Sequence, residues 1–352
     1  VGVIGTGATA VQLIPIVAKE VGQMTVFQRT PNYCAPLRNS EVNSETQAAW
    51  KVSYPEIHKR CRETPVGFMH DFDPRSALEA SEEERMAQYE ELWALPGFKK
   101  WLGNYYDIMT NMEANETFAE FVRNKIRARV NDPVVAELLA PKDHPFGSKR
   151  IPLETEYYEA YNRDNVKLVD IRNAPIECIT EKGVKLQGGA EYEFDIIIYA
   201  TGFDAVSGPL TRIDIRGEGG QTFKDKWAAG PRSYLGLQTA GFPNFFIGTN
   251  SALCNYTVCA EMVVEWIADC IGHLREKNLA SIAPTLEAED AWVEHSNELA
   301  AGTILSAADS WFMGANIPGK KRAVLLYANS AREYRKKCAE VAASGYEGFA
   351  LR

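Results

Sequence analysis

The pattern of apolar and polar residues over positions 1–30 predicts a strand, a helix and a second strand. Val1–Ile4 is a short apolar run, Ala8–Val21 is predicted as a helix, and Met24–Gln28 is again apolar. Strands that alternate with helices are typical of a parallel sheet in a doubly wound α/β fold. Because a parallel strand normally has neighbours on both sides, a chain that opens inside one leads us to expect a longer natural protein.

The pattern changes between about Asn39 and Gly147, where strand signals give way to amphipathic helices. Ser81–Glu84 fits a capping box that begins one helix. Apolar residues recur at helical spacing between Glu116 and Val130, and Asn131–Pro133 is suited to end that helix and start the next. We therefore expect a helical insertion over residues 39–147.

Strand patterns return after the insertion. They occur at Val166–Val169, Ile176–Thr180 and Asp195–Ala200, and the last is a continuous apolar run that predicts a strand buried on both faces. Thr257–Asn278 is predicted as a long helix, with Cys259 on its apolar stripe.

Composition and charge narrow the class of protein. Hydrophobic residues make up 45% of the chain and charged residues 24%, which fits a globular protein. The net charge of -9 argues against a nucleic-acid surface, and no apolar run has the length of a membrane span. The seven cysteines follow no framework spacing, so we expect free thiols and a cytoplasmic location. The five histidines show no paired metal-ligand spacing, so no metal site is expected.

A glycine-rich turn after the first strand predicts dinucleotide binding. Gly5–Ala10 fits G-x-G-x-x-G/A: Gly5 would make a tight turn, Gly7 would let a pyrophosphate approach the backbone, and Ala10 would let helix and strand pack closely. The helix N-terminus would present free N–H groups to the phosphates. The alternative is a turn that is merely rich in glycine.

The end of the second strand favours NADP over NAD. NAD-binding folds usually place an acidic residue there for the ribose 2′-hydroxyl. This chain has Arg29 and Thr30 instead, and an arginine can form two hydrogen bonds with a 2′-phosphate. The alternative is an ordinary surface arginine at a strand end.

Several segments together resemble the Baeyer–Villiger monooxygenase family of flavoproteins. The resemblance covers nearly the whole chain, including the insertion, and its motifs are specific to that family. It is carried by Phe27–Asn32, Pro145–Arg150, Asn162–Val166, Ala200–Gly202, Lys226–Arg232 and Trp311–Lys320.

The resemblance implies a flavoprotein with two dinucleotide-binding domains. Residues 1–38 and 148–194 would form a Rossmann-type NADP-binding domain, interrupted by the helical insertion. Residues 195–352 would form the C-terminal part of an FAD-binding domain. On residue physics alone, Ala200–Gly202 is no more than a turn after a strand, whereas the family has a second cofactor signature at this place.

The implied reaction inserts oxygen next to a ketone carbonyl. In the family, NADPH reduces FAD, O2 adds to give a peroxyflavin, and its attack on a ketone yields an ester or lactone. Arg150 would stabilise the negative charge that develops, since a guanidinium is always protonated. Lys149 would contact the 2′-phosphate of NADP, and Trp311 the bound cofactor. Without the resemblance, Lys149 and Arg150 would be a solvated basic pair.

The remaining sites are also carried over by position. Ser251, Ala252, Leu253 and Cys254 would line the substrate pocket. The predicted cofactor contacts are Gly5, Thr6, Gly7, Ala8, Thr9, Gln12, Arg29, Thr30, Lys149, Ala200, Thr201, Gly202 and Trp311.

The chain departs from the family in two places. The glycine fingerprint for FAD is not in this sequence, so we expect the chain alone to bind FAD weakly. The loop after Gly241–Asn244 is shorter than in the family, so it is either remodelled or affected by an error in the gene model. Rival functions are a flavin monooxygenase that oxidises nitrogen or sulfur, and a non-catalytic NADP-binding remnant.

One cysteine pair allows two interpretations. Cys254 and Cys259 have the spacing of a redox disulfide in some flavin reductases. In those enzymes the pair follows the FAD glycine motif, so we favour plain packing of these two cysteines here.

Overall fold

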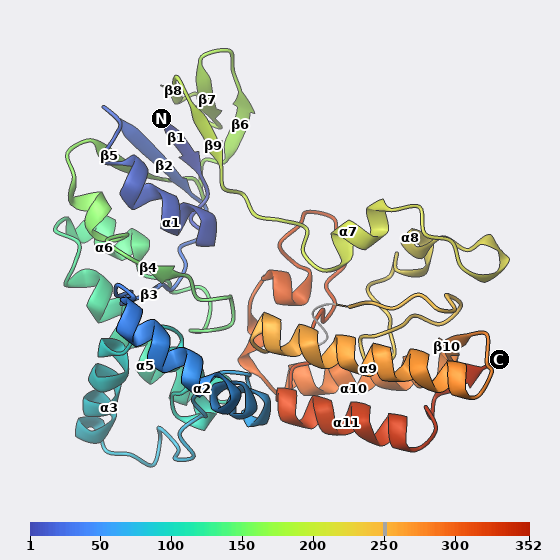
Figure 1. The fold of residues 1–352 in the computed structure, drawn as a ribbon. Helices are drawn as coiled ribbons and strands as arrows, with labels where there is room; N and C mark the ends of the chain where they lie inside the picture. Colours follow the sequence, from blue (N-terminus) through green and yellow to red (C-terminus); the bar gives the residue numbers. More distant parts are fainter. Residues whose placement is uncertain (249–251) are drawn as a thin grey trace. The chain divides into compact units, whose positions relative to one another are not determined.

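The computed structural model describes residues 1–248 and 252–352, which divide into two compact units (Figure 1). The first unit comprises Val1–Ser40 and Asp73–Phe203, and the second comprises Glu41–Phe72 and Asp204–Arg352. These bounds differ from the predicted domains at two places: residues 41–72 fall in the second unit, and residues 195–203 fall in the first.

The first unit is built on a four-stranded parallel sheet, which confirms the Rossmann-type α/β fold. Its strands are β1 (Gly2–Ile4), β2 (Met24–Gln28), β5 (Val166–Asp170) and β9 (Ile197–Tyr199), in the order β5-β2-β1-β9. Helix α1 (Ala8–Val17) connects β1 to β2. Because all four strands are parallel, their carboxyl ends lie at one edge of the sheet, where doubly wound folds bind ligands.

The predicted burial of β9 on both faces is wrong. Tyr199 is 61% exposed, and Ile196, directly before the strand and within the predicted apolar run, is 56% exposed. The physical reason is position: β9 pairs with β1 and, in the described parts of the chain, with no other strand, so it forms an edge of the sheet. An antiparallel meander comes directly before it, formed by β6 (Ile176–Ile179), β7 (Gly183–Leu186) and β8 (Glu191–Glu193).

Helices make up the rest of the first unit, as predicted for most of the insertion. Ser81 and Glu84 form the predicted capping box, and Asp132 caps the helix that follows it. Two short strands, β3 (Ala35–Pro36) and β4 (Leu153–Glu154), pair where the insertion leaves and rejoins the sheet. The helices are α3 (Glu82–Ala94), α4 (Lys99–Leu102), η1 (Tyr106–Met109), α5 (Met112–Arg127), α6 (Pro133–Leu139) and η2 (Glu159–Asn162).

Buried polar side chains attach the insertion to the strands. Lys100 is fully buried, and its ammonium donates to the carbonyls of Pro36, Leu95 and Gly97 at 2.7–3.0 Å. Burial lowers the pKa of Lys100 to about 8. An ammonium buried without hydrogen-bond partners would be costly, so Lys100 holds these three carbonyls around it. This fixes the position at which the chain leaves the sheet.

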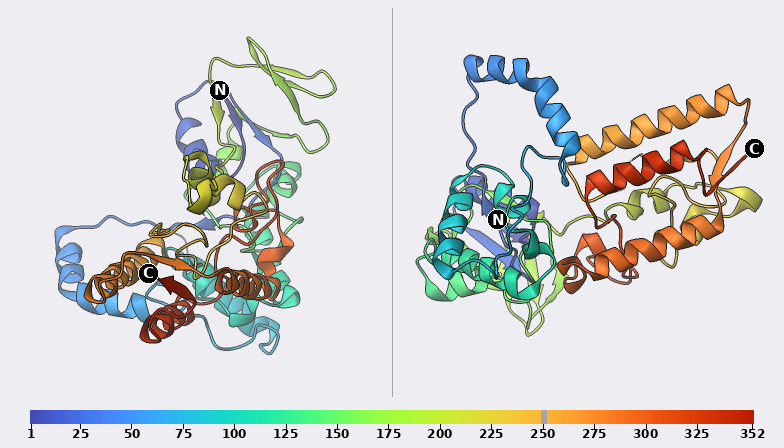
Figure 2. Two further views of the ribbon diagram at one scale, coloured as in Figure 1. Left: turned by 90° about the vertical axis from the view of Figure 1, so that its right-hand side faces the viewer. Right: turned by 90° about the horizontal axis from the view of Figure 1, so that it is seen from below.

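The second unit has a core between long helices. Trp266 on α9, Trp292 on α10 and Tyr334 on α11 all belong to this core, and Figure 2 shows α9 and α11 side by side. The main helices and strands are α2 (Ser44–Glu63), α9 (Tyr256–Glu276), β10 (Ile282–Pro284), α10 (Leu286–Ala301), α11 (Ala331–Ala343) and β11 (Phe349–Leu351). The shorter helices are α7 (Ser207–Arg212), η3 (Glu218–Gly220), α8 (Phe223–Lys226), η4 (Ile304–Ala307) and η5 (Trp311–Met313).

Helix α2 packs with the second unit, although it lies in the sequence within the predicted insertion. His58 contacts Glu261 at 2.6 Å, and Arg62 forms a two-pronged ion pair with Glu265 on α9. No residue of α2 is buried, so these polar contacts hold the helix at the surface.

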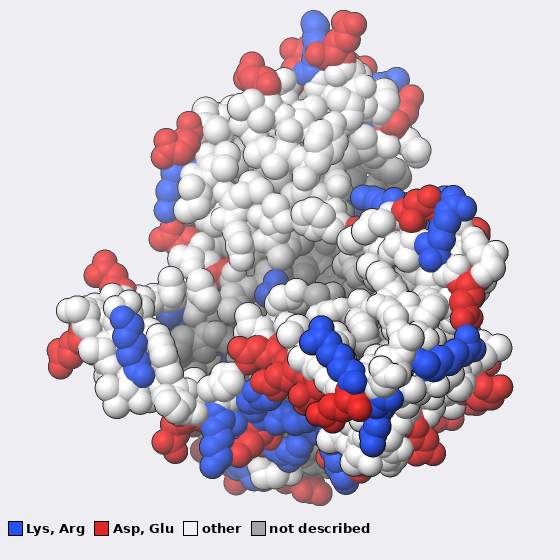
Figure 3. Space-filling view, turned by 45° about the vertical axis from the view of Figure 1, so that its right-hand side comes forward, with Lys and Arg blue, Asp and Glu red and all other residues white. Residues whose placement is uncertain are grey.

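Figure 3 shows the charged side chains on one face of the molecule. On the face shown in Figure 3, acidic and basic side chains are intermixed. Among the described residues, the helices that reach the length of a membrane span are not apolar enough to form one.

Candidate cofactor and active site

The glycine turn has the backbone geometry that phosphate binding needs. Gly5 has a φ of +109°, and a Cβ there would collide with the carbonyl oxygen of Ala200. A Cβ at Gly7 would meet nothing within 4 Å, and Gly7 caps α1 without a side-chain hydrogen bond. The first N–H groups of α1 are therefore open to a ligand, and Ala10 is fully buried behind them.

Three predicted segments meet at the carboxyl edge of the sheet. The amide of Ala200 donates to the carbonyl of Ile4 at 2.9 Å, which places Ala200–Gly202 beside the glycine turn. The hydroxyl of Thr6 donates to the carbonyl of Thr30 at 2.9 Å, which joins the glycine turn to the end of β2. Thr9 and Gln12 are exposed on α1.

Arg29 is exposed directly after β2, and among the described residues it forms no ion pair. Asp170 lies at the end of the neighbouring strand β5, opposite Gln28 of β2 in the register of the sheet. Arg172 binds both oxygens of Asp170 at 2.6–3.0 Å and holds the pKa of that carboxyl low. The charge of Arg29 is thus available to an anion.

The segment before Arg150 is held rigidly by the insertion. Asn115 donates to the carbonyls of Ile108 and Phe146 at 2.8 Å and accepts from the amide of Phe146 at 2.9 Å. Gly147 has a φ of +83°, and a Cβ there would run into Trp101. The Ser148 hydroxyl donates to the carbonyl of Pro145. These contacts fix the backbone from which Lys149 and Arg150 extend.

Arg150 lies next to the loop that follows β2. Its carbonyl accepts a hydrogen bond from the Asn32 amide at 3.3 Å, and Asn32 comes shortly after Arg29 and Thr30. Its guanidinium is exposed and lies 5.6 Å from the ring centre of Phe98. The structure therefore brings Arg150 to the same loop that carries Arg29.

A buried histidine beside Lys149 was not singled out from the sequence. His144 is buried in a loop and contacts the carboxylate of Asp143 at 2.7 Å. Burial lowers the pKa of His144, and the charge of Lys149 lowers it further. Asp143 and His144 are adjacent in the sequence and directly precede Pro145–Arg150, the segment that resembles the family. This adjacency is the sequence signal that could have identified the pair.

The remaining predicted residues belong to the second unit. Trp311 is partly exposed in η5 and packs against Phe312, with ring centres 4.4 Å apart. Ala252 pairs with Tyr327, and the amide of Leu253 donates to the Tyr327 carbonyl at 3.1 Å. Ser251 lies outside the described residues, as do Thr249 and Asn250 of the shortened loop.

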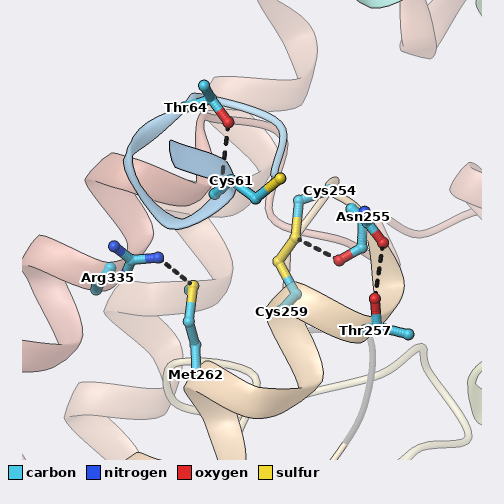
Figure 4. Close-up of a disulfide and its surroundings, with 8 residues drawn as sticks. All are labelled: Cys61, Thr64, Cys254, Asn255, Thr257, Cys259, Met262 and Arg335. Carbon is cyan, nitrogen blue, oxygen red and sulfur yellow. Dashed lines mark hydrogen bonds between the residues drawn. A yellow bond between two sulfur atoms is a disulfide. The ribbon is translucent and has the colours of Figure 1, made fainter. Parts of the chain in front are cut away.

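The cysteine prediction is wrong at two positions. Cys254 and Cys259 form a disulfide, shown in Figure 4, and five cysteines are free. The chain turns into α9 after Asn255, which brings the two Cα atoms to 6.4 Å, within the range of disulfides. The cytoplasmic location, which rested on free thiols, stays a prediction. No group of histidine, cysteine and acidic residues in the described ranges could hold a metal ion.

Comparison with known proteins gives specific relatives, although no family model matches. The chain is 47% identical over 358 residues to 2-oxo-Delta(3)-4,5,5-trimethylcyclopentenylacetyl-CoA monooxygenase of Pseudomonas putida, covering 100% of the chain and 66% of the relative. It is 42% identical over 356 residues to acetone monooxygenase (methyl acetate-forming) of Gordonia sp. strain TY-5, covering 100% and 67%.

A solved structure agrees with these relatives. The crystal structure of OTEMO in complex with FAD and NADP matches with a TM-score of 0.96 and 46% identity, covering 100% of this chain and 66% of that one. The chain thus spans about two thirds of the length of its relatives.

We predict that Asn115→Leu lowers the free energy of unfolding by about 3 kcal/mol, because it leaves buried backbone groups of Ile108 and Phe146 without partners. Chemical denaturation followed by circular dichroism measures the loss. The control is Asn124→Leu, an exposed position on the same helix, which should change stability little. Equal effects of the two substitutions would contradict the role of Asn115.

Proposed function

The chain belongs to the Baeyer–Villiger monooxygenase family, and we propose from this premise that it takes part in NADPH- and O2-dependent oxygen insertion next to a ketone carbonyl. The observation that carries the proposal is that the glycine turn is hydrogen-bonded to the loop that follows β2 and carries Arg29, and that Asn32 of the same loop is hydrogen-bonded to the backbone of Arg150. Its products would be esters or lactones. The acetone monooxygenase relative is named as methyl acetate-forming, and methyl acetate is an ester.

The first unit is proposed to bind NADP. The space at Gly7 and the open N–H groups of α1 fit a pyrophosphate. A side chain at position 7 would occupy that space. Arg29 and Thr30 would receive the 2′-phosphate, with Lys149 as a second cation.

The second unit is proposed to contribute to the flavin and substrate sites. Residues 204–352, which belong to the second unit, would form the C-terminal part of the FAD-binding domain together with residues 195–203 of the first unit, and Trp311 would contact the bound cofactor. When bound, FAD would accept a hydride from NADPH and activate O2. Ala252, Leu253 and Cys254 would line the pocket for the ketone.

Arg150 is proposed as the catalytic arginine. Its guanidinium is permanently charged, is exposed rather than paired, and extends from a backbone held by Asn115 and Gly147. A fixed cation of this kind stabilises negative charge that develops during oxygen transfer, without reorganisation at the moment of reaction. The Phe98 ring restricts where the guanidinium can lie.

The reaction class can be tested in a chimera, because the chain spans about two thirds of its relatives. The segment of the acetone monooxygenase that carries the FAD glycine fingerprint is joined to this chain, and the chimera receives FAD, NADPH, O2 and a simple ketone. We expect ester or lactone by gas chromatography. Sulfoxide or N-oxide from competing thioether and amine substrates, without ester, would support the rival monooxygenase. NADP binding with no product from any substrate would support the non-catalytic remnant.

We predict that Arg29→Ala weakens binding of NADP by about tenfold or more and leaves NAD binding nearly unchanged, because a charge-assisted hydrogen bond to the 2′-phosphate is lost. Titration calorimetry on the 352-residue chain gives both affinities. Arg212→Ala, an exposed arginine of the second unit, serves as the control. A variant that keeps the original preference for NADP would show that Arg29 does not read the phosphate.

We predict that Arg150→Ala in the chimera lowers ester formation by about 10²–10³, because a preorganised charge is removed from the site of oxygen transfer. Consumption of NADPH should continue, since Arg29 and the glycine turn are intact. Lys149→Ala should instead raise the KM for NADPH. Both rates are measured with the same ketone, and near-normal ester formation by Arg150→Ala would refute the assignment.

A further inference from the structure

The second unit contains a cleft between α9 and α11 that the proposed function does not use. It has a volume of about 300 Å³, similar to the smaller ligand pockets of proteins. Its walls are largely apolar and include Leu237, Val263, Trp266, Cys338, Ala339 and Ala342. A ligand of this cleft would therefore bury a hydrocarbon portion against the two helices.

A cation with unused hydrogen-bond donors lies at one end of the cleft. Arg335 on α11 donates to the thioether sulfur of Met262 at 3.1 Å, as Figure 4 shows, and a thioether is a weak acceptor. Its Nε is buried without a hydrogen-bond partner. No carboxylate of the described residues forms an ion pair with Arg335. A half-buried guanidinium in this state is costly unless an anion reaches it.

The nearby acids do not satisfy Arg335. Both oxygens of Glu265 are taken by the guanidinium of Arg62, whose positive charge also acts on Arg335. Burial and the charge of Arg62 lower the pKa of Arg335, against the opposing charges of Glu265 and of Glu63, which is exposed to water. Asp269 lines the cleft as well, but it is exposed to water on α9. The end of the cleft at Arg335 thus has an unsatisfied cation, while the acids are either paired or solvated.

We propose that this cleft binds a medium-chain carboxylate, with its hydrocarbon chain against Trp266, Val263 and Ala339 and its carboxylate on Arg335. The guanidinium offers planar, paired donors that match a carboxylate, which the thioether of Met262 cannot do. The site lies entirely within the second unit and involves none of the proposed catalytic or cofactor residues, so its test is independent of oxygenase activity.

The ligand class is tested by titration calorimetry on the 352-residue chain with decanoate, decanol and decyltrimethylammonium below their aggregation limits. We expect decanoate to bind about tenfold or more tightly than decanol, since one charge-assisted hydrogen bond is worth at least that ratio. Hexanoate should bind more weakly than decanoate because it buries less hydrocarbon. Equal binding of decanoate and decanol, tighter binding of the ammonium, or no binding would each overturn the proposal.

Variants locate the site. Arg335→Gln should abolish the preference for decanoate over decanol, and Ala339→Phe should weaken both ligands by filling the cleft. The matched control is Arg332→Gln on the same helix, because Arg332 is exposed and contacts Glu63 and Asp71 instead. Thermal unfolding without ligand verifies that each variant is folded. Decanoate binding that is unchanged in both Arg335→Gln and Ala339→Phe would place the ligand elsewhere and refute the assignment.

Discussion

The architecture of the first unit depends on the close approach of two backbone turns at one edge of the sheet. The carbonyl of Ala200 occupies the space where a Cβ of residue 5 would lie, so only glycine allows β1 and β9 to end side by side. This contact brings the glycine turn to Ala200–Gly202, and the hydroxyl of Thr6 then connects the turn to the end of β2. The proposed cofactor site thus follows from one steric constraint and two short hydrogen bonds.

The position of Arg150 depends on buried polar groups instead of on sheet geometry. Asn115 and Lys100 satisfy backbone carbonyls where the insertion meets the strands, and each connects segments that are distant in sequence. Such groups are costly to bury unless every partner is in place, so they specify one arrangement of the loop. The backbone of Arg150 therefore has a defined position, although the exposed side chain makes few contacts of its own.

Local signals in the sequence predicted much of this structure. The glycine turn, the capping box at Ser81 and the cap at Asp132 are determined by residues within one helical turn of each other, and all three are present. The errors concern partners that are far apart. An apolar run such as Asp195–Ala200 fits a central or an edge strand equally well, and nothing within α2 reveals that it packs with α9. The disulfide escaped prediction because Cys259 also satisfies the apolar stripe of its helix.

Charge pairing distinguishes structural arginines from those proposed to bind ligands. In this acidic chain, Arg123 and Arg127 pair with glutamates within the insertion, and Arg129 pairs with glutamates of the segment that follows it. By contrast, Arg29 and Arg150 form no ion pair within the described residues and both lie at the loop after β2. A protein with an excess of acidic residues could neutralise these two cations readily. That Arg29 stays unpaired beside the glycine turn, where α1 presents its N–H groups, is consistent with a polyanionic ligand supplying the missing charge.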